Sequence, residues 1–317
     1  MTINEIKLKI KFITPLLIHG ANPREVDSIG LTGKALRGCW RFWFRAFVGG
    51  MIRNITKDKL FELESKVFGS SDENVGAKFR MVIEPAGSLE PHTTQINFSN
   101  RTVPFKGYKE GSQFLIRIIP RRNMDNDQIN VLLASIWLWA NLGAIGQRVR
   151  RGFGSPVIES PEPFSEISLP VKQEFNNSSE LGNYLIEGLK KVYEIFKSWN
   201  SISSLENLNP PLYDASSVSP SNPPFFIISS FKQIAVAEED VGDNVVTALN
   251  NVHGNSGCPE LGSANPRRAS PVFIRLHKVN NKFYPVVTWS KPMSSGCARN
   301  YILNNCKCKN YLDGSPV

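Results

Sequence analysis

The first half of the chain alternates between strand-like and helix-like patterns of apolar residues. From Ile6 onward, residues 3–12 (INEIKLKIKF) place an apolar side chain at every second position, which is the period of a half-buried strand. Residues 33–48 and 57–69 instead repeat apolar side chains at helical spacing, and Gly69 ends the second run. The same two patterns predict strands over 77–85, 111–120 and 155–160, and a helix over 126–143.

This order of elements predicts a ferredoxin-like domain. The strands and helices follow one another as β-α-β-β-α-β, with one additional helix. The interval 85–111 between two of the strands carries turn-forming proline, asparagine and glycine residues and few apolar runs. We expect a long loop there, and long ordered loops usually carry function or contact a partner.

The second half has a weaker pattern. Residues 200–222 and 253–266 are rich in serine, asparagine, proline and glycine, so we expect loops in both intervals. At 317 residues, the chain has the length of two domains of about 150 residues each. The apolar pattern predicts a helix over 181–199 and strands over 223–229, 270–279 and 282–289. These elements indicate a second α+β unit, but the pattern does not fix the order of its strands.

The charge of the chain is unevenly distributed. The net charge is +9, and residues 1–155 hold 23 lysines and arginines against 13 acidic residues. Residues 156–317 hold 14 against 15, so the whole basic excess lies in the first half. This asymmetry predicts a polyanion-binding half joined to a neutral one. The apolar content of 41% is ordinary, and no apolar run would span a bilayer or form a signal peptide, so we expect a cytoplasmic protein.

The helix predicted over 33–48 carries cations on one side only. They recur every three or four residues and fall within one sector of roughly 80°. Large apolar side chains fall in a sector more than about 120° away, so one side of the helix is buried and the other is basic. No acidic residue lies between Asp27 and Asp58, and this single sign favours anion binding over an ordinary solvated face. The cations are Lys34, Arg37, Arg41 and Arg45, and the apolar residues are Leu36, Trp40, Trp43 and Phe47.

The segment GQRVRRGFGS, residues 146–155, combines three glycines with three arginines directly after a predicted helix. Glycine lets a backbone approach closely, and arginine offers a planar fork to phosphates. No GK[ST] follows, which excludes a nucleotide P-loop, and the preceding helix excludes a dinucleotide fingerprint. The pattern alone leaves two interpretations open: a phosphate-binding loop, or a helix-to-strand turn whose arginines face solvent.

Five cysteines cannot all form disulfides within one chain. Cys39 and Cys258 are isolated in the sequence, whereas Cys297, Cys306 and Cys308 cluster near its end. The step from Cys306 to Cys308 would suit a soft metal, but zinc sites usually have longer spacers and four ligands. We therefore expect a tail of reduced cysteines near the end of the sequence and no metal or other cofactor, with a zinc site as the alternative.

Two segments together resemble a known family. GKALRGCWRFWFRAF (33–47), followed about a hundred residues later by LGAIGQRVRRGFGS (142–155), resembles the RAMP superfamily of CRISPR-associated proteins. Within it, the pair is most similar to the family of first RAMP subunits of the type III-B Cmr effector complex. In that family an arginine- and tryptophan-rich first helix occurs with a glycine-rich loop of the form GxRxRRGFGS. The resemblance covers about the first 160 residues, and in the second half only RRASPVFIRL (267–276) resembles a strand of the family.

The resemblance implies an α+β fold with two ferredoxin-like (RRM-like) domains in tandem, which we place at 1–160 and 161–317. It also implies binding of guide RNA near its 3′ end, contact with the paired target RNA and with neighbouring RAMP subunits, and no membrane attachment. The residues expected to bind RNA are Lys34, Arg37, Arg41, Arg45, Gly146, Arg148, Arg150, Arg151, Gly152, Phe153 and Gly154.

Four histidines raise the question of catalysis, because some RAMP relatives cut RNA without metal by using a histidine as general acid or base. His19 follows the first predicted strand, where such relatives often place one, whereas His92 and His253 fall in loops and His277 in a strand. Spacing fixes no second acid or base, no HD or GGDD motif is present, and the family assigns target cutting to a different subunit. We expect a non-catalytic binder. The alternatives are a guide-processing endoribonuclease of the same superfamily and a structural adaptor that caps an assembly.

Overall fold

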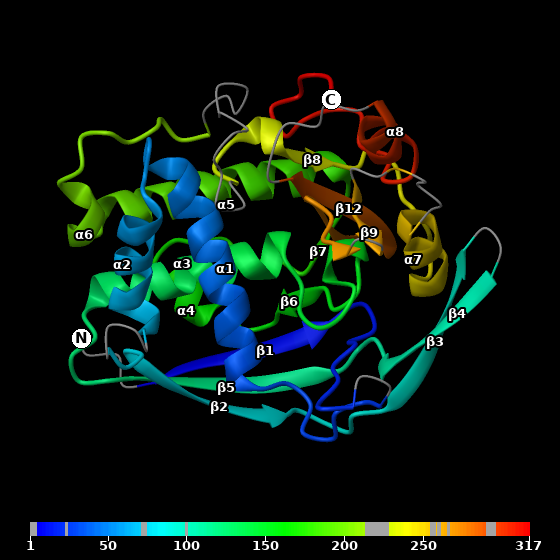
Figure 1. Cartoon of the computed structure of the whole chain (residues 1–317), viewed down its shortest axis with the longest axis horizontal. Coiled ribbons are helices and arrows are strands. Elements are labelled where there is room, and N and C mark those ends of the chain that lie inside the picture. The colour runs from blue at the N-terminus through cyan, green and yellow to red at the C-terminus, as the bar shows by residue number, and fades with distance from the viewer. Residues whose placement is uncertain are drawn as a thin grey trace.

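A four-stranded sheet with helices on one side forms the first half of the molecule (Figure 1). The computed structural model describes residues 5–22, 25–70, 75–98, 101–212, 228–253, 258, 261–264, 267–289 and 296–317. The strands are β1 (Ile6–Phe12), β2 (Phe79–Pro85), β5 (Gln113–Pro120) and β6 (Pro156–Ile158), and the helices are α1 (Gly33–Met51), α2 (Lys57–Phe68) and α3 (Asn126–Leu142). The spatial order is β2-β5-β1-β6 with every neighbouring pair antiparallel, which confirms the predicted ferredoxin-like fold.

The helix α3 lies at the centre of the molecule. Asp125 caps it in a capping box with Gln128, and nearly every later residue of the helix is buried. A helix that is apolar all round must be covered on all sides. Here α1 packs on one side of α3, and α5 (Ser178–Ser198), from the second half, packs on another.

The interval 85–111 is a β-hairpin and not the predicted loop. Its strands β3 (Pro91–Phe98) and β4 (Arg101–Tyr108) pair in antiparallel register and extend from the first sheet towards α7 (Val245–His253), as Figure 1 shows. Sequence patterning missed the hairpin because, among the described side chains of β3, only Thr94 and Ile96 are buried. Two buried positions are too few to give a visible alternation.

A second four-stranded sheet organises the other half, in the order β7-β11-β12-β8. Its strands are β7 (Glu174–Phe175), β8 (Ile234–Val236), β11 (Val272–Val279) and β12 (Lys282–Trp289). The two-residue strand β7 is parallel to β11, and the other neighbours are antiparallel. The strand predicted over 223–229 lies outside the described residues apart from Ile228 and Ser229, which are not in a strand. The remaining elements are α4 (Glu162–Ser165), α6 (Asn200–Ser203), α8 (Gly296–Asn304), η1 (Val149–Arg151), η3 (Phe231–Gln233), β9 (Ser263–Ala264) and β10 (Arg267–Arg268).

The two halves share their hydrophobic core, whose two clusters both contain residues from each half. The predicted boundary at residue 160 falls between β6 and α4, but buried side chains of both halves belong to the same clusters. Phe44 of α1 packs on Phe196 of α5 with ring centroids 5.5 Å apart. A Cβ atom on Gly188 of α5 would lie 2.0 Å from the Trp137 ring of α3, so only glycine permits this helix contact. None of the described helices is both long and apolar enough to cross a membrane.

A buried arginine joins the end of α3 to the second sheet. Arg275 of β11 is 2% exposed, and its Nε donates to the carbonyl of Ala140 at 3.1 Å. Its two other nitrogens donate to the carbonyls of Leu276 and Pro156. The neighbouring His277 bonds through Nε2 to the carbonyl of Asn141 at 2.9 Å. The carbonyls in the last turn of a helix have no following turn to donate hydrogen bonds to them. In α3, side chains from β11 supply these hydrogen bonds.

Candidate nucleic-acid interface

The first helix of the fold presents cations along one edge. The Thr32 hydroxyl caps α1 by accepting from the backbone N–H of Ala35. The aromatic side of α1, including Trp40 and Phe47, is fully buried in the core. This packing fixes the rotation of the helix, so the stripe of Lys34, Arg37, Arg41 and Arg45 faces outward and towards α2.

Two of the four cations are paired with one carboxylate, that of Glu64 of α2. Arg41 Nε pairs with Glu64 Oε1, and Arg45 lies 3.0 Å from Glu64 Oε2. The Glu64 side chain is 0% exposed, so its charge is compensated by these arginines inside the fold. The expectation that no acid compensates this row of cations is therefore wrong for Arg41 and Arg45. Packing of α2 on α1 brings in Glu64, which lies outside the acid-free interval between Asp27 and Asp58. Lys34 and Arg37 form no ion pair with the described residues.

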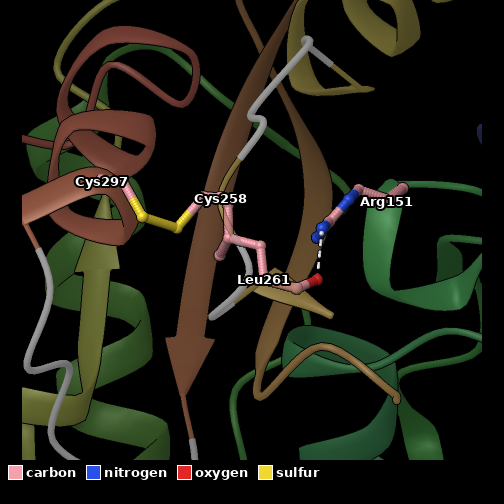
Figure 2. The surroundings of a disulfide bond; sticks show 4 residues. All are labelled: Arg151, Cys258, Leu261 and Cys297. Carbon is pink, nitrogen blue, oxygen red and sulfur yellow. Dashed lines mark hydrogen bonds between the residues drawn. A yellow bond between two sulfur atoms is a disulfide. The ribbon is translucent and has the colours of Figure 1, made fainter. Parts of the chain in front are cut away.

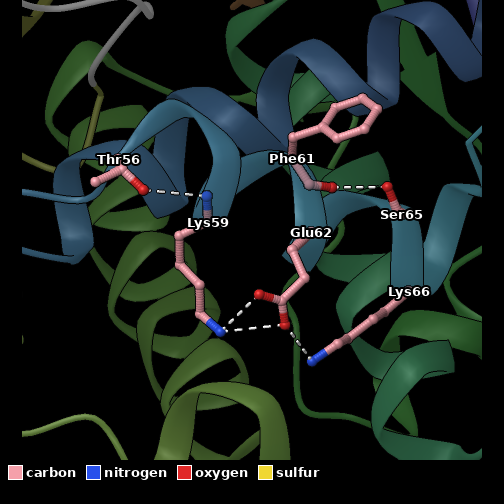
Figure 3. A network of polar contacts seen from close by, with 6 residues as sticks. All are labelled: Thr56, Lys59, Phe61, Glu62, Ser65 and Lys66. Atoms are coloured by element: carbon pink, nitrogen blue, oxygen red, sulfur yellow. Dashed lines mark hydrogen bonds and ion pairs between the residues drawn. The ribbon is translucent and has the colours of Figure 1, made fainter. Parts of the chain in front are cut away.

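The outer side of α2 also carries ion pairs, as Figure 3 shows. Glu62 lies between Lys59 and Lys66, at 2.9 Å from one ammonium and 3.0 Å from the other. Hydrogen bonds from Lys59 and Lys66 hold the pKa of Glu62 below its usual value. Each of the two ion-paired groups at α2 keeps one excess positive charge, whereas Lys34 and Arg37 at the start of α1 have no ion-pair partner among the described residues.

An open groove, which we call the α1 groove, runs beside these free cations. Lys34, Arg37, Gly38 and Arg41 form one wall, and residues 68–70 and 75–77 form the other. A Cβ atom on Gly38 would meet no other atom within 4 Å, so the helix backbone is accessible there. The groove can admit a chain of negative charges alongside Lys34 and Arg37.

The glycines of the 146–155 segment allow close approach of other parts of the same chain, side chains at Gly152 and backbone at Gly146 and Gly154. Gly152 has a φ of 84°, and a Cβ atom there would lie 3.1 Å from Leu276. Gly154 has a φ of 62°, and a Cβ atom would lie 2.0 Å from the carbonyl oxygen of Ile145. Gly146 similarly approaches the carbonyl of Leu17. Gly152 and Gly154 are buried, so the idea that their lack of bulk clears space for RNA is corrected: they allow the loop to fold tightly.

Phe153 is also internal. It is 0% exposed, and its ring packs on Phe105 of β4 and His253 of α7, with centroids 5.6 Å and 5.5 Å apart. The side chain therefore joins the glycine-rich segment to the hairpin and to α7. This burial removes Phe153 from the residues that we propose to contact RNA.

The three arginines of the segment lie over aromatic rings. Arg148 lies over Phe105, with its guanidinium carbon 4.8 Å from the ring centroid, and Arg150 lies over Phe273 of β11 at 4.5 Å. Burial lowers the pKa of both guanidinium groups below the usual value. In the described part of the chain, no carboxylate lies within ion-pair distance of either arginine. Sequence reasoning missed the two supporting rings, because they come from β4 and β11.

Arg151 is held more firmly by the second half. It lies over Tyr301 at 5.3 Å, and its guanidinium donates to the carbonyl of Leu261 at 3.1 Å, a bond drawn in Figure 2. The backbone N–H of Leu261 in turn donates to the carbonyl of Cys258. This arrangement gives Arg151 a structural role at the junction of the two halves.

A disulfide lies next to this junction. Cys258 is bonded to Cys297 at the start of α8, and the bond appears beside Leu261 in Figure 2. The expectation of a tail of reduced cysteines is corrected at Cys297 by this pair, which tertiary folding brings together across 39 residues. Cys39, Cys306 and Cys308 remain thiols, and burial raises the pKa of Cys306 to about 12. The described residues contain no group of three or more metal-ligating side chains.

The four histidines are dispersed over the structure. His253 and His277 are buried, and burial lowers the pKa of His253 to about 3. His92 is exposed on β3, and His19 is half-buried in the segment after β1, which also contacts the glycine-rich loop through Leu17. The structure brings none of these imidazoles together with another histidine.

The N-terminal half matches a known family. Residues 9–157 match the RAMP superfamily. Two relatives come from Pyrococcus furiosus. The CRISPR system Cmr subunit Cmr1-2 is 26% identical over 176 residues, which covers 46% of this chain and 90% of the relative. The subunit Cmr1-1 is 28% identical over 211 residues, covering 62% of this chain and 60% of the relative.

Solved structures share the fold along most of the chain. Apo Cmr1 from Pyrococcus furiosus superposes with a TM-score of 0.58 at 21% identity, covering 91% of this chain and 88% of that one. A chain of the type III-B Cmr-beta complex bound to cognate target RNA gives a TM-score of 0.56 at 13% identity, covering 90% and 94%. These likenesses confirm the α+β fold. The chain is therefore similar to the RAMP superfamily over residues 9–157 and shares the fold of these Cmr chains along most of its length.

Proposed function

We propose that this chain is a non-catalytic, RNA-binding subunit of a type III-B CRISPR (Cmr) complex. Its relatives in Pyrococcus furiosus are named as Cmr subunits, and a Cmr complex whose chain has the same fold was solved with target RNA. The finer expectations belong to the same proposal: guide RNA bound near its 3′ end, contact with the paired target RNA, and neighbouring RAMP subunits.

The observation that carries the proposal is a pair of uncompensated basic groups on either side of α1. Lys34 and Arg37 lie along the α1 groove, and Arg148 and Arg150 lie on the loop at the other side. Phe273 links the two regions, because its ring contacts Phe42 of α1 and supports Arg150. Between them α1 exposes only small residues, Ala35 and Gly38.

This arrangement suits the phosphates of an RNA chain. A guanidinium stacked on an aromatic ring keeps its N–H groups at the edge, where they can bond two oxygens of one phosphate. Stacking also restricts the side chain before RNA arrives, which reduces the entropy lost on binding. We assign no proton transfer to the site, because no histidine is among the described residues that line the α1 groove or support Arg148 and Arg150.

Paired substitutions test the proposal. Replacing Arg148 and Arg150 with alanine should weaken binding of single-stranded RNA and reduce the slope of log affinity against log salt by roughly 1.4, about 0.7 for each lost phosphate contact. The matched control is Lys190→Ala with Lys191→Ala on α5, which removes the same charge from the neutral half. Binding is measured by fluorescence anisotropy at several salt concentrations. An unchanged slope in the arginine variant would favour the structural adaptor.

A separate measurement addresses catalysis. His19→Ala should leave any RNA cutting by the assembled complex unchanged, because we assign His19 no proton transfer. Turnover of labelled repeat and target RNA is followed with the variant and the parent. Loss of cutting, with assembly and RNA binding intact, would favour the endoribonuclease alternative.

A further inference from the structure

The free edge of the first sheet carries a second concentration of uncompensated arginines. A hollow there is lined by Arg80 of β2, by Ile119 and Pro120 at the end of β5, and by residues 121–123 of the turn that follows. Arg80, Arg121 and Arg122 are all exposed. No residue in this hollow belongs to the α1 groove or to the glycine-rich loop.

No acid of the described residues pairs with these three side chains. The nearest described acids in sequence are Asp125 and Asp127 for the two turn arginines, and Asp125 is used as the cap of α3 that accepts from the N–H of Gln128. For Arg80 the nearest is Glu84, four residues along β2, which forms no ion pair with it. Other cations on the same face of the sheet do have ion-pair partners. Lys9 of β1 pairs with Glu159, and Arg117 of β5 pairs with Glu5. The hollow is therefore the unneutralised end of a largely paired face.

The backbone fixes the position of the hollow. Arg80 is paired in register with Ile119, and the N–H of Arg121 donates to the carbonyl of Lys78 at 2.6 Å. The turn itself closes through a bond from the N–H of Met124 to the carbonyl of Arg121. Three cations are thus fixed to one rigid sheet edge and one closed turn, instead of a long loop.

The hollow is a short distance along the chain from the α1 groove, on the other face of the sheet, because Phe79 packs on Trp40 of α1 and the next residue, Arg80, points the opposite way. Ala77 lines that groove, and Arg80, three residues further along the same segment, lines the hollow. An extended segment rises by about 3.3 Å per residue, so the two depressions are separated by roughly 10 Å of chain. A single linear polyanion can therefore pass from Lys34 and Arg37 around β2 to the three arginines.

We infer that the Arg80–Arg121–Arg122 hollow is a second binding site for the RNA phosphodiester backbone, which a strand leaving the α1 groove reaches by passing around β2. This inference rests on the proposed function and extends it by giving the bound strand a direction across the protein. Guanidinium groups suit phosphate because each can bond two oxygens at once. The contacts carry no base information, so the site binds RNA of any sequence.

The test compares RNA length with salt dependence. The full chain is titrated into fluorescein-labelled oligouridylates of about 4 to 16 nucleotides, the range of site sizes seen in single-strand-binding modules. For the parent, the slope of log affinity against log salt should steepen with length until the strand reaches the hollow. In the variant Arg80→Ala, Arg121→Ala, Arg122→Ala, the slope should stop steepening sooner and end roughly two units shallower.

The controls separate this inference from the proposed function. Lys190→Ala, Lys191→Ala, Lys197→Ala removes the same charge from α5 and should follow the parent at every length. Arg122→Glu alone, at the exposed turn, should give a partial effect in the same direction even if the triple variant folds poorly. If the parent binds RNA and the hollow variants bind long RNA just as the parent does, this inference alone is overturned. That result would favour an acidic protein partner at the hollow. A parent that binds no RNA would overturn both proposals.

Discussion

At the scale of single residues, Glu64 changes the chemistry of the basic helix most. Its carboxylate is inaccessible to water and is compensated by Arg41 and Arg45. Removing both arginines leaves a buried, unpaired charge, which typically costs about 3–5 kcal/mol. We expect Arg41→Ala with Arg45→Ala to lower the free energy of unfolding by that order, measured by urea denaturation.

Two variants check that the loss comes from the buried acid. Lys34→Ala with Arg37→Ala removes the same charge from the same helix but breaks no ion pair, so stability should change little. Adding Glu64→Leu to the double arginine variant should recover part of the loss. Equal stability of the two double variants would show that Glu64 is not held by this pairing.

Gly152 gives a second residue-scale prediction. Its φ of 84° and the closeness of Leu276 make Gly152→Ala destabilising by more than about 1 kcal/mol. Gly38→Ala is the matched control, because that glycine is helical with open space around it, and alanine should stabilise the helix by about 1 kcal/mol. Thermal melts of both variants give the comparison. Similar shifts of the two melting temperatures would contradict the role given to Gly152.

Sequence alone identified the residues of the site better than their roles. The cations of α1 and of the glycine-rich segment stand out by charge and spacing, which are local properties. The partners of these cations are distant in sequence: Glu64 for Arg41, Phe105 for Arg148 and Phe273 for Arg150. Such pairs depend on how elements pack, and one sequence does not contain that information.

At the scale of elements, α7 is attached through a buried imidazole. His253, in the last turn of α7, packs on Phe153 and Phe105, and burial lowers its pKa to about 3. The folded state therefore requires neutral histidine, whereas the unfolded chain binds a proton near the ordinary value of 6.5. Stability from this packing is complete above pH 6.5 and is lost progressively as the pH falls towards 3.

We expect the melting temperature of the parent to fall between pH 7 and pH 5, and to fall less in His253→Leu. This window lies above the ordinary pKa of glutamate, 4.5, so the titration of paired carboxylates contributes little to it. His277 is also buried with a lowered pKa, so part of the slope should remain in the variant. Parallel pH profiles for parent and variant would contradict the prediction.

The periodicity of apolar residues predicts an element well where one side of that element is buried and the other is exposed to solvent. The strand β1 and the amphipathic helix α5 are of this kind, and both were predicted close to their observed ends. The β3–β4 hairpin was missed because it is mostly exposed, so its residues carry little pattern. The two-residue strand β7 is too short for any period to be detected.

At the scale of the whole molecule, the Cys258–Cys297 bond closes a loop of 39 residues that contains β11 and β12. In the chain-entropy account, such a link stabilises the fold by about 4 kcal/mol. We expect Cys297→Ser to lower the melting temperature, and reductant to lower that of the parent but not that of the variant further. Cys39→Ser, which removes a thiol outside the bond, should respond to reductant as the parent does. A parent insensitive to reductant would contradict this account.

Arg275 has a consequence for how the protein is made. The carbonyl of Ala140 accepts a hydrogen bond from Arg275, which is synthesised 135 residues later. At translation rates of about 5–20 residues per second, the end of α3 stays open to water for on the order of ten seconds. During that interval the N-terminal half has α1 packed on its central helix but lacks β11, which caps the end of that helix, so the final packing must follow synthesis of β11. The nascent chain is therefore most exposed to aggregation before its second sheet emerges from the ribosome.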